Sequence, residues 1–306
     1  MTDVSVRGLS KRYGGVTAVA DLTFDAPAGE VTGFLGPNGS GKTTTLRMLL
    51  GLVRPTAGEA LIGGRHYARL ADPRAEVGAV LEATGFHPGR SGRNHLRILV
   101  RAARLPEGRV GQALERVGLT ASADRRVGGY SLGMRQRLAL AAALLGDPGV
   151  LILDEPANGL DPAGMATLRE LLRELAGEGR TILVSSHVLS EVAQTADRVV
   201  IISDGALRFA GPLAELGGTG VAVRSPRTAD LSKLLTARGF QVRITGESSL
   251  EVQGAPAEEI SRLAAEEGIA LSSLGEGSAA LEAAFLRLTG QSAQSASAAP
   301  ITADIA

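Results

Sequence analysis

The chain has 306 residues, of which 44% are hydrophobic, and its 32 basic side chains balance its 32 acidic ones. This length and apolar content exclude disorder for most of the chain and leave room for one large domain and a smaller one. Because the formal net charge is zero, no bulk electrostatic attraction to nucleic acid or to an anionic membrane surface is expected. The lack of cysteine excludes disulfides and thiolate metal sites, and the four histidines show no metal-ligand spacing.

Neither a membrane span nor a leader peptide is predicted. The apolar run 138–146 ends at Asp147, well short of the roughly 18 residues that a spanning helix needs. The N-terminal segment contains no apolar core of the kind that a secretory signal peptide requires. We therefore expect a cytoplasmic protein.

The chain opens with an α/β pattern. Strand-like residues occupy 4–6, 18–24 and 31–35, and the last of these leads through a glycine-rich turn into a predicted helix over 41–50. Helical patterns separated by Gly and Pro then dominate, which indicates a helical subdomain inserted into an α/β core at about 84–147. The predicted helices of this insertion cover 93–104, 110–117 and 131–145.

The sheet resumes at 150–155 and continues in strands at 181–186 and 198–203, with a helix at 165–175. These strands are continuously apolar, which is typical of a buried, largely parallel sheet.

The pattern changes after residue 217. Strands and helices then follow in the order β-α-β-β-α-β with a final helix, which predicts a small α+β domain of ferredoxin-like fold over 218–290. The tail 291–306 has no charge before Asp304 and no periodicity, and we expect it to be disordered. The first domain accordingly covers 1–217.

A phosphate-binding loop is predicted after the strand 31–35. Gly36, Gly41, Lys42 and Thr43 have the spacing GxxxxGK[ST], and a helix follows them, which is the context of a P-loop. Backbone N–H groups would cradle the phosphates, Lys42 would reach the outer ones, and Thr43 would offer its hydroxyl to Mg²⁺. The alternative is a plain glycine-rich turn, but a lysine is notable in a chain that has only three lysines and 29 arginines. The nucleotide-binding residues would be Gly36, Pro37, Asn38, Gly39, Ser40, Gly41, Lys42, Thr43 and Thr44.

Two acidic side chains end the apolar strand at 150–155. Ligands of open α/β sheets bind at this edge, so Asp154 fits a Mg²⁺ contact and Glu155 fits the base that polarises the attacking water. The alternative is a strand-end cap that leads into Pro156.

Another candidate site opens the helix at 131–145. Ser131 precedes an apolar run, and its hydroxyl either caps the helix or helps to bind an anion at the helix start.

The P-loop, YSLGM, LDEP, NGLDP and SSH follow one another in an order that resembles the ATP-binding cassette (ABC) ATPases over about residues 1–215. The resemblance is greatest to the ATPases of daunorubicin and bacitracin exporters, which also carry a small C-terminal domain. It implies a RecA-like α/β core with a helical subdomain, ATP hydrolysis with Mg²⁺, and a head-to-tail homodimer. It also implies a separate transmembrane permease, which would hold the chain at the inner face of the cell membrane, and transport of drugs or hydrophobic small molecules out of the cell.

The resemblance also assigns residues. Tyr13 would stack on adenine, and Ser131 with the Gly133 backbone would contact the γ-phosphate of ATP held by the second copy. Asp161 would link the two sites, and His187 would contact the γ-phosphate and relay to Glu155. Simpler alternatives are a surface Tyr13, a helix cap at Asp161 and a structural His187.

The sequence departs from the common pattern of these ATPases at three positions. Leu132 replaces a Gly and Met134 a Gln in the YSLGM motif, and Glu82 stands where the family usually has a Gln that binds Mg²⁺. A carboxylate can still ligate Mg²⁺, so the predicted metal ligands are Thr43, Glu82 and Asp154.

Two other functions compete with that of a transporter subunit. A soluble ABC machine that acts on nucleic acid or ribosomes predicts a long insertion, a second cassette or a basic surface, but only 89 positions separate Lys42 from Ser131 and the net charge is zero. A small-molecule kinase with a P-loop would have no use for YSLGM and NGLDP. We therefore expect no nucleic-acid partner.

Overall fold

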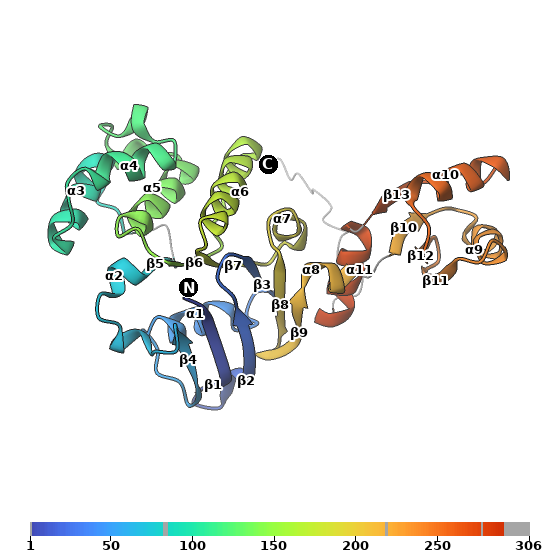
Figure 1. Cartoon of the computed structure of the whole chain (residues 1–306), viewed down its shortest axis with the longest axis horizontal. Coiled ribbons are helices and arrows are strands. Elements are labelled where there is room, and N and C mark those ends of the chain that lie inside the picture. The colour runs from blue at the N-terminus through green and yellow to red at the C-terminus, as the bar shows by residue number, and fades with distance from the viewer. Residues whose placement is uncertain (1, 82–84, 218–219, 277, 291–306) are drawn as a thin grey trace, which may run out of the picture. The chain divides into compact units, whose positions relative to one another are not determined.

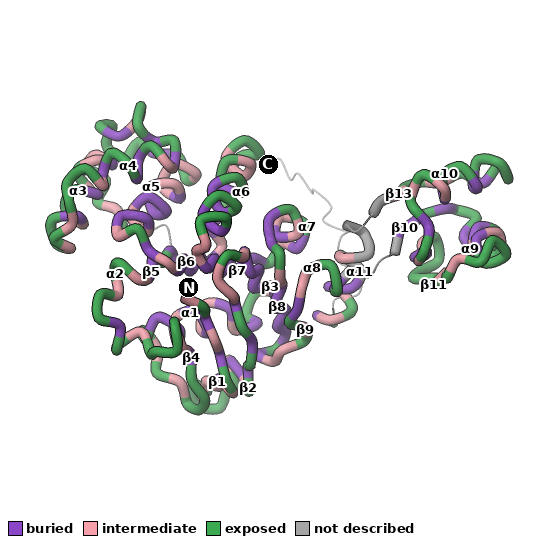
Figure 2. The backbone as a smooth tube through the Cα atoms, in the orientation of Figure 1, coloured by how far each residue is buried: buried purple, intermediate pink, exposed green. Residues whose placement is uncertain are grey.

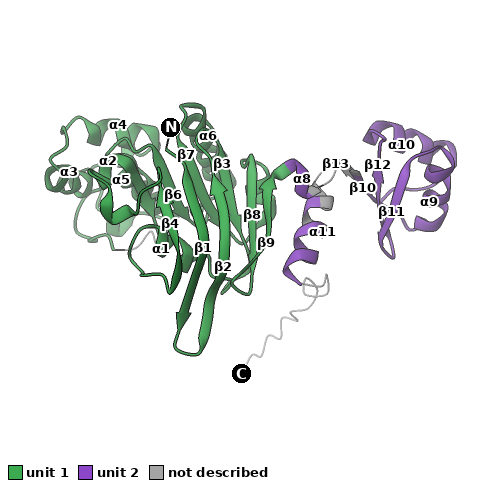
Figure 3. Cartoon of the chain, turned by 60° about the horizontal axis from the view of Figure 1, so that its bottom comes forward, with its two compact units in different colours: residues 1–213 green, residues 214–306 purple. Residues whose placement is uncertain are grey.

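The computed structural model describes residues 2–81, 85–217, 220–276 and 278–290. The chain divides into two compact units, Met1–Leu213 and Ala214–Ala306 (Figure 3). The predicted tail 291–306 lies outside the described residues, as does Glu82.

An antiparallel sheet of three strands, in the order β2-β1-β4, forms one layer of the first unit. In β1 the alternation of buried and more exposed residues places Val4 and Val6 in the core, and Leu9 joins them after a register shift. The first two strands run longer than the predicted ones because their pairing continues to Tyr13 and Val16. Polar side chains in these extensions interrupt the apolar pattern on which the prediction depends. The strands are β1 (Val4–Tyr13), β2 (Val16–Ala26) and β4 (Ala57–Ile62).

A six-stranded sheet, in the order β5-β6-β7-β3-β8-β9, forms the centre of the same unit. All neighbours pair in parallel except β8 and β9. Every residue of β3, β6 and β7 is buried, as their continuous apolar sequences predict (Figure 2). The strands are β3 (Val31–Leu35), β5 (Val77–Val80), β6 (Val150–Asp154), β7 (Thr181–Ser186), β8 (Arg198–Ser203) and β9 (Ala206–Pro212).

Helices cover both faces of this sheet. On one face Phe34 stacks on Phe24 of β2 at 5.4 Å between ring centroids, and α1 contributes Leu46 to the same core. On the other face Gly33 lies against Val192 of α7, where a methyl group would approach to 2.1 Å. The helices are α1 (Lys42–Leu49), α6 (Pro162–Gly177) and α7 (Leu189–Ala193).

The predicted helical insertion is present, and its three main helices contact one another (Figure 1). Ser91 and Ser131 cap two of them, which explains why these helices begin where they do. The last helix contacts β5, which connects the insertion to the sheet. The insertion contains α3 (Gly92–Ala103), α4 (Arg109–Arg116) and α5 (Leu132–Leu144), with the short helices η2 (Thr120–Ser122) and η3 (Val127–Gly129) between α4 and α5. Two further short helices, η1 (Tyr67–Arg69) and α2 (Pro73–Glu76), precede it.

The second unit begins within α8 (Leu213–Gly217) and contains an antiparallel sheet in the order β11-β12-β10-β13. Its elements follow one another in the predicted order, and ferredoxin-like remains our interpretation of that order. The residues IALSSL at 269–274 predict the last strand of this unit, but the observed strand spans Ser273–Glu276, because Ile269 donates its N–H to the Ala264 carbonyl and closes the preceding helix. The elements are β10 (Gly220–Arg224), α9 (Thr228–Ala237), β11 (Gln241–Gly246), β12 (Ser249–Gln253), α10 (Ala257–Glu266), β13 (Ser273–Glu276) and α11 (Ser278–Thr289).

Candidate nucleotide site

The loop between β3 and α1 can exist only with glycine at particular positions. A methyl group on Gly36 would lie 2.4 Å from the Ile202 carbonyl oxygen, and one on Gly41 would lie 2.4 Å from that of Ala18. Gly41 also has φ +102°, a conformation that side-chain-bearing residues rarely adopt. The backbone is therefore held tightly around the start of α1, with its N–H groups available to an anion.

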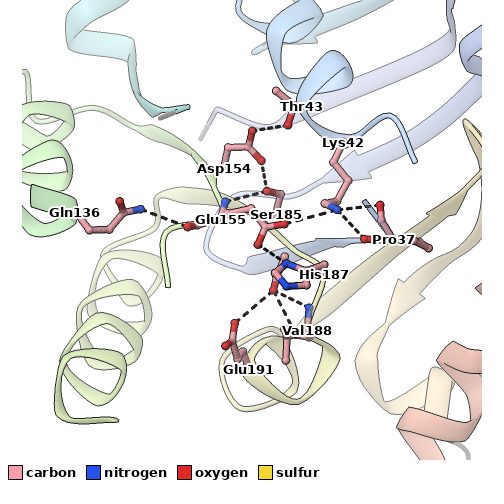
Figure 4. Close-up of polar contacts among 12 residues, drawn as sticks. Pro37, Lys42, Thr43, Gln136, Asp154, Glu155, Ser185, His187, Val188 and Glu191 are labelled. Carbon is pink, nitrogen blue, oxygen red and sulfur yellow. Dashed lines mark hydrogen bonds and ion pairs between the residues drawn. The ribbon is translucent and has the colours of Figure 1, made fainter. Parts of the chain in front are cut away.

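Lys42 is the first residue of α1, and its side chain folds over the loop (Figure 4). Its Nζ donates to the carbonyl oxygens of Gly36 at 2.6 Å and Pro37 at 3.2 Å, and lies 3.6 Å from Glu155 Oε1. Burial lowers the pKa of the Lys42 ammonium, and the carboxylates of Glu155 and Asp154 oppose that shift. A phosphate oxygen could take the place of these carbonyl acceptors.

Asp154 connects the P-loop helix to the sheet. It is buried at the end of β6, where its Oδ2 accepts a hydrogen bond of 2.7 Å from the Thr43 hydroxyl. Its Oδ1 accepts from the Ser185 hydroxyl, because Asp154 and Ser185 are register partners on β6 and β7. A hydroxyl and a carboxylate beside a phosphate loop are the oxygen donors that Mg²⁺ uses together with nucleotide phosphates.

The protein does not supply a complete metal cage here. Within the described ranges, no group of three or more His, Cys, Asp and Glu side chains could hold a metal ion. A Mg²⁺ ion at Thr43 and Asp154 would therefore depend on phosphate oxygens and water for its remaining ligands, as Mg²⁺ commonly does.

Glu155 does not belong to the strand, contrary to the predicted range 150–155. Strand β6 ends at Asp154, and Glu155 has φ +49°, which takes it out of the extended conformation. Its N–H donates to Ser185 Oγ at 3.0 Å, and its carbonyl accepts from Gln136 Nε2 at 3.3 Å. Hydrogen bonds to Ser185 and Gln136 thus help to hold this strained residue, a situation often found at functional sites.

His187 meets the carboxylate of Glu155. The distance from His187 Nδ1 to Glu155 Oε2 is 2.8 Å, and the imidazole is 41% exposed (Figure 4). The structure therefore brings Lys42, Glu155 and His187 together at the ends of neighbouring elements.

Sequence reasoning did not single out two residues of this cluster. Ser185 is fully buried and bridges Asp154 and Glu155, and Gln136 is buried in α5 with its amide on the Glu155 carbonyl. The sequence does carry a signal for Ser185, which is a serine at the end of a largely apolar strand. Nothing in the local sequence indicates the role of Gln136.

The remaining predicted residues lie outside this cluster. Tyr13 is 49% exposed, with the Lys11 ammonium 4.9 Å from its ring centroid. Ser131 caps α5 by accepting from the Met134 N–H, and Asp161 caps α6 by accepting from Gly164. The capping alternative therefore holds for both residues, which leaves a further role in binding open.

These features define a P-loop nucleotide hydrolase. They are a glycine-rich loop after a buried parallel strand, a lysine and a hydroxyl at the start of the next helix, and an Asp-Glu pair at the end of a nearby strand. Residues 19–158 match the ABC transporter family. The chain belongs to this family, and it is the ATP-binding, ATP-hydrolysing subunit of an ABC transporter. Residues 219–282 match a domain of unknown function (DUF8746).

Similar proteins support this membership. The bacitracin transport ATP-binding protein BcrA of Bacillus licheniformis is 42% identical over 209 residues, which cover 67% of this chain and 68% of that protein. The Nod factor export ATP-binding protein I of Burkholderia orbicola is 37% identical over 301 residues, covering 95% and 98% of the two chains. A solved ATP-binding subunit of an ABC transporter superposes with a TM-score of 0.64 at 26% identity, covering 85% of this chain and 98% of that one. No helix within the described residues is long and apolar enough to cross a membrane.

Proposed function

We propose that this chain binds ATP with Mg²⁺ at the cluster around Lys42 and hydrolyses it to drive export by a separate transmembrane permease. The single observation that carries this proposal is the continuous polar chain from Thr43 through Asp154, Ser185 and Glu155 to His187. The P-loop, a candidate metal ligand and a candidate base are thereby held in fixed positions relative to one another.

Nucleotide binding would use the loop 36–44, with Lys42 on the outer phosphates and Tyr13 on the adenine. The exposure of Tyr13 supports the second role, since a stacking platform must be accessible to its ligand. Thr43 and Asp154 would hold Mg²⁺, which supplies charge neutralisation to the phosphates. Glu82 remains our third predicted metal ligand.

Glu155 would accept the proton of the attacking water, and His187 would hold the carboxylate in place. A carboxylate 2.8 Å from an imidazole nitrogen and 3.6 Å from an ammonium is oriented by both neighbours. Geometry within hydrogen-bond reach is the first requirement for a general base.

We further infer that two copies share each ATP, head to tail. Ser131 and Asp161 are exposed at the starts of α5 and α6, and each side chain accepts a hydrogen bond from the first turn of its own helix. The Ser131 hydroxyl, with the Gly133 backbone beside it, could bind a second copy's γ-phosphate, whereas Asp161 would link the two sites. This arrangement would account for a candidate anion-binding helix start that lies outside the Lys42 cluster.

The names of the relatives suggest the transported class. One similar protein is named for bacitracin transport and another for Nod factor export, and these names support our proposal that drugs or hydrophobic small molecules are exported. The chain would then lie at the cytoplasmic face of the membrane through its permease. A soluble machine acting on nucleic acid or ribosomes is not favoured, since net charge is zero.

Complementation in mixed dimers tests the shared site. Homodimers of Lys42→Ala and of Ser131→Arg should both lose hydrolysis, because each site would lack one contribution. The mixed dimer would keep one whole site, and we expect γ-phosphate-directed crosslinks from the intact P-loop to reach Ser131 of the other chain. Crosslinks confined to one chain would contradict the head-to-tail arrangement.

A further inference from the structure

Two short segments with mirrored sequences contact each other at the starts of α5 and α6. Leu132 and Gly133 open α5, and Gly159 and Leu160 lie in the loop that leads to α6. A methyl group on Gly159 would lie 2.2 Å from Leu132 Cδ2 and 2.6 Å from its Cγ. A methyl group on Gly133 would lie 3.2 Å from Leu160 Cδ2 and 3.3 Å from the Gly159 carbonyl oxygen. Each leucine therefore covers the glycine of the other segment.

This reciprocal Leu/Gly pair depends on the absence of side chains at both glycines. Gly159 also has φ +76°, so any other residue would be strained there even without Leu132. Leu160 extends further toward α6, where a methyl group on Gly164 would lie 3.5 Å from its Cδ2. Leu160 is thus half-buried between the start of α5 and the start of α6, whereas Leu132 is 56% exposed.

The pair lies between the two helix-capping residues. Ser131 directly precedes Leu132, and Asp161 directly follows Leu160. Any shift of the loop 158–161 relative to α5 would have to break both leucine contacts. The positions of Ser131 and Asp161 are therefore coupled through apolar packing, with no hydrogen bond required between them.

We propose that Leu132 is a positioning residue, which packs on Gly159 and so makes the Ser131 helix start and the Asp161 loop approach the second copy's nucleotide as one unit. This inference rests on the proposed shared site. With a smaller side chain at position 132, the two segments would have to be ordered separately when the dimer closes. The cost of that ordering weakens closure without changing the P-loop of the same chain.

The test measures ATP-dependent dimerisation in the full-length Glu155→Gln background, where slow hydrolysis should keep ATP in place. Adding Leu132→Ala should weaken the dimer roughly tenfold in sedimentation velocity. Leu132→Met retains a long apolar side chain and should restore dimerisation to within about twofold. Leu52→Ala is the matched control, because Leu52 is also an exposed leucine of the first unit, at 65%.

Two further measurements separate positioning from misfolding. The affinity of the isolated monomer for a fluorescent ATP analogue should be unchanged in Leu132→Ala, because Lys42 and its loop are untouched. Gly159→Ala should weaken dimerisation more when Leu132 is present than in the Leu132→Ala background, where the two closest colliding atoms are gone.

The failures are distinguishable. A Glu155→Gln parent that stays monomeric in ATP overturns the shared site and this inference with it. If the Glu155→Gln parent dimerises, and Leu132→Ala dimerises as well as the Leu52→Ala control, the inference about Leu132 is overturned while the shared site stands. Additive effects of Gly159→Ala and Leu132→Ala overturn it too.

Discussion

The two units bury polar side chains for different purposes. In the first unit Asp154 and Ser185 are buried, and their hydrogen bonds lead to Thr43, Glu155 and the P-loop. In the second unit the buried Ser225 and Thr228 bond to nearby main-chain carbonyls. Ser225 Oγ donates to Ala270 at 2.8 Å, and Thr228 Oγ1 donates to Ser225 at 2.7 Å.

This difference separates a chemical network from a structural one. A buried hydroxyl that closes a turn satisfies the backbone and leaves no group for a ligand. A buried hydroxyl that holds two acidic residues in place fixes groups that still have capacity to bind or accept a proton. We therefore propose that the chemistry lies in the first unit and that the second unit regulates or stabilises the dimer.

The largest effect is expected from Lys42→Ala. Removing the ammonium takes away the cation that we assign to the outer phosphates, so ATP should bind weakly and hydrolysis should fall to background. Nucleotide binding by fluorescence and phosphate release measure the two effects. Lys233→Ala in the second unit is the matched control, because Lys233 is exposed and should leave both unchanged. Wild-type turnover of the Lys42 variant would remove the central assignment.

Glu155→Gln should bind ATP and hydrolyse it at least roughly 100-fold more slowly, because the amide keeps the shape but cannot take up the proton. Single-turnover kinetics with bound ATP isolate the chemical step. His187→Gln should be impaired less than Glu155→Gln, since we assign His187 to holding the base. Nearly normal hydrolysis in Glu155→Gln would shift the role of base toward His187.

Much of this network follows from local sequence, and some of it does not. The spacing of Gly36, Gly41 and Lys42 predicts the P-loop because a phosphate cradle is built from consecutive residues. Continuous apolar runs predict the buried strands for a similar reason, since burial of a parallel sheet affects each residue of the strand.

Contacts between distant segments could not be predicted in the same way. Ser185 reaches Asp154 only because β6 and β7 pair in one particular register. The positive φ of Glu155 is imposed by the residues around it, so the residue type at this position does not predict it. The Leu132–Gly159 contact likewise requires the loop before α6 to return to the start of α5.

A pair of buried serines gives a direct comparison of the units. Ser185→Ala and Ser225→Ala should each lower the free energy of unfolding by about 1–3 kcal/mol, because each leaves buried partners unsatisfied. Only Ser185→Ala should also change ATP hydrolysis, by roughly tenfold, with a shifted Mg²⁺ dependence, because Asp154 loses its second hydrogen bond. Urea denaturation and activity at graded Mg²⁺ concentrations measure the two effects. Equal losses of activity in the two variants would contradict the division into chemical and structural networks.

The smallest effect on nucleotide binding is expected from removal of the second unit. A chain ending after Gly217 keeps α8 and every residue that we assign to the nucleotide, so its affinity for ATP should stay within about twofold of the full chain. Circular dichroism and thermal melting would first establish that the shortened chain is folded. ATP-dependent dimerisation in the Glu155→Gln background then shows what the second unit adds. A lower dimer affinity with unchanged monomer binding would mean that this unit acts on assembly, whereas a folded truncate that cannot bind ATP would show that it contributes to the site itself.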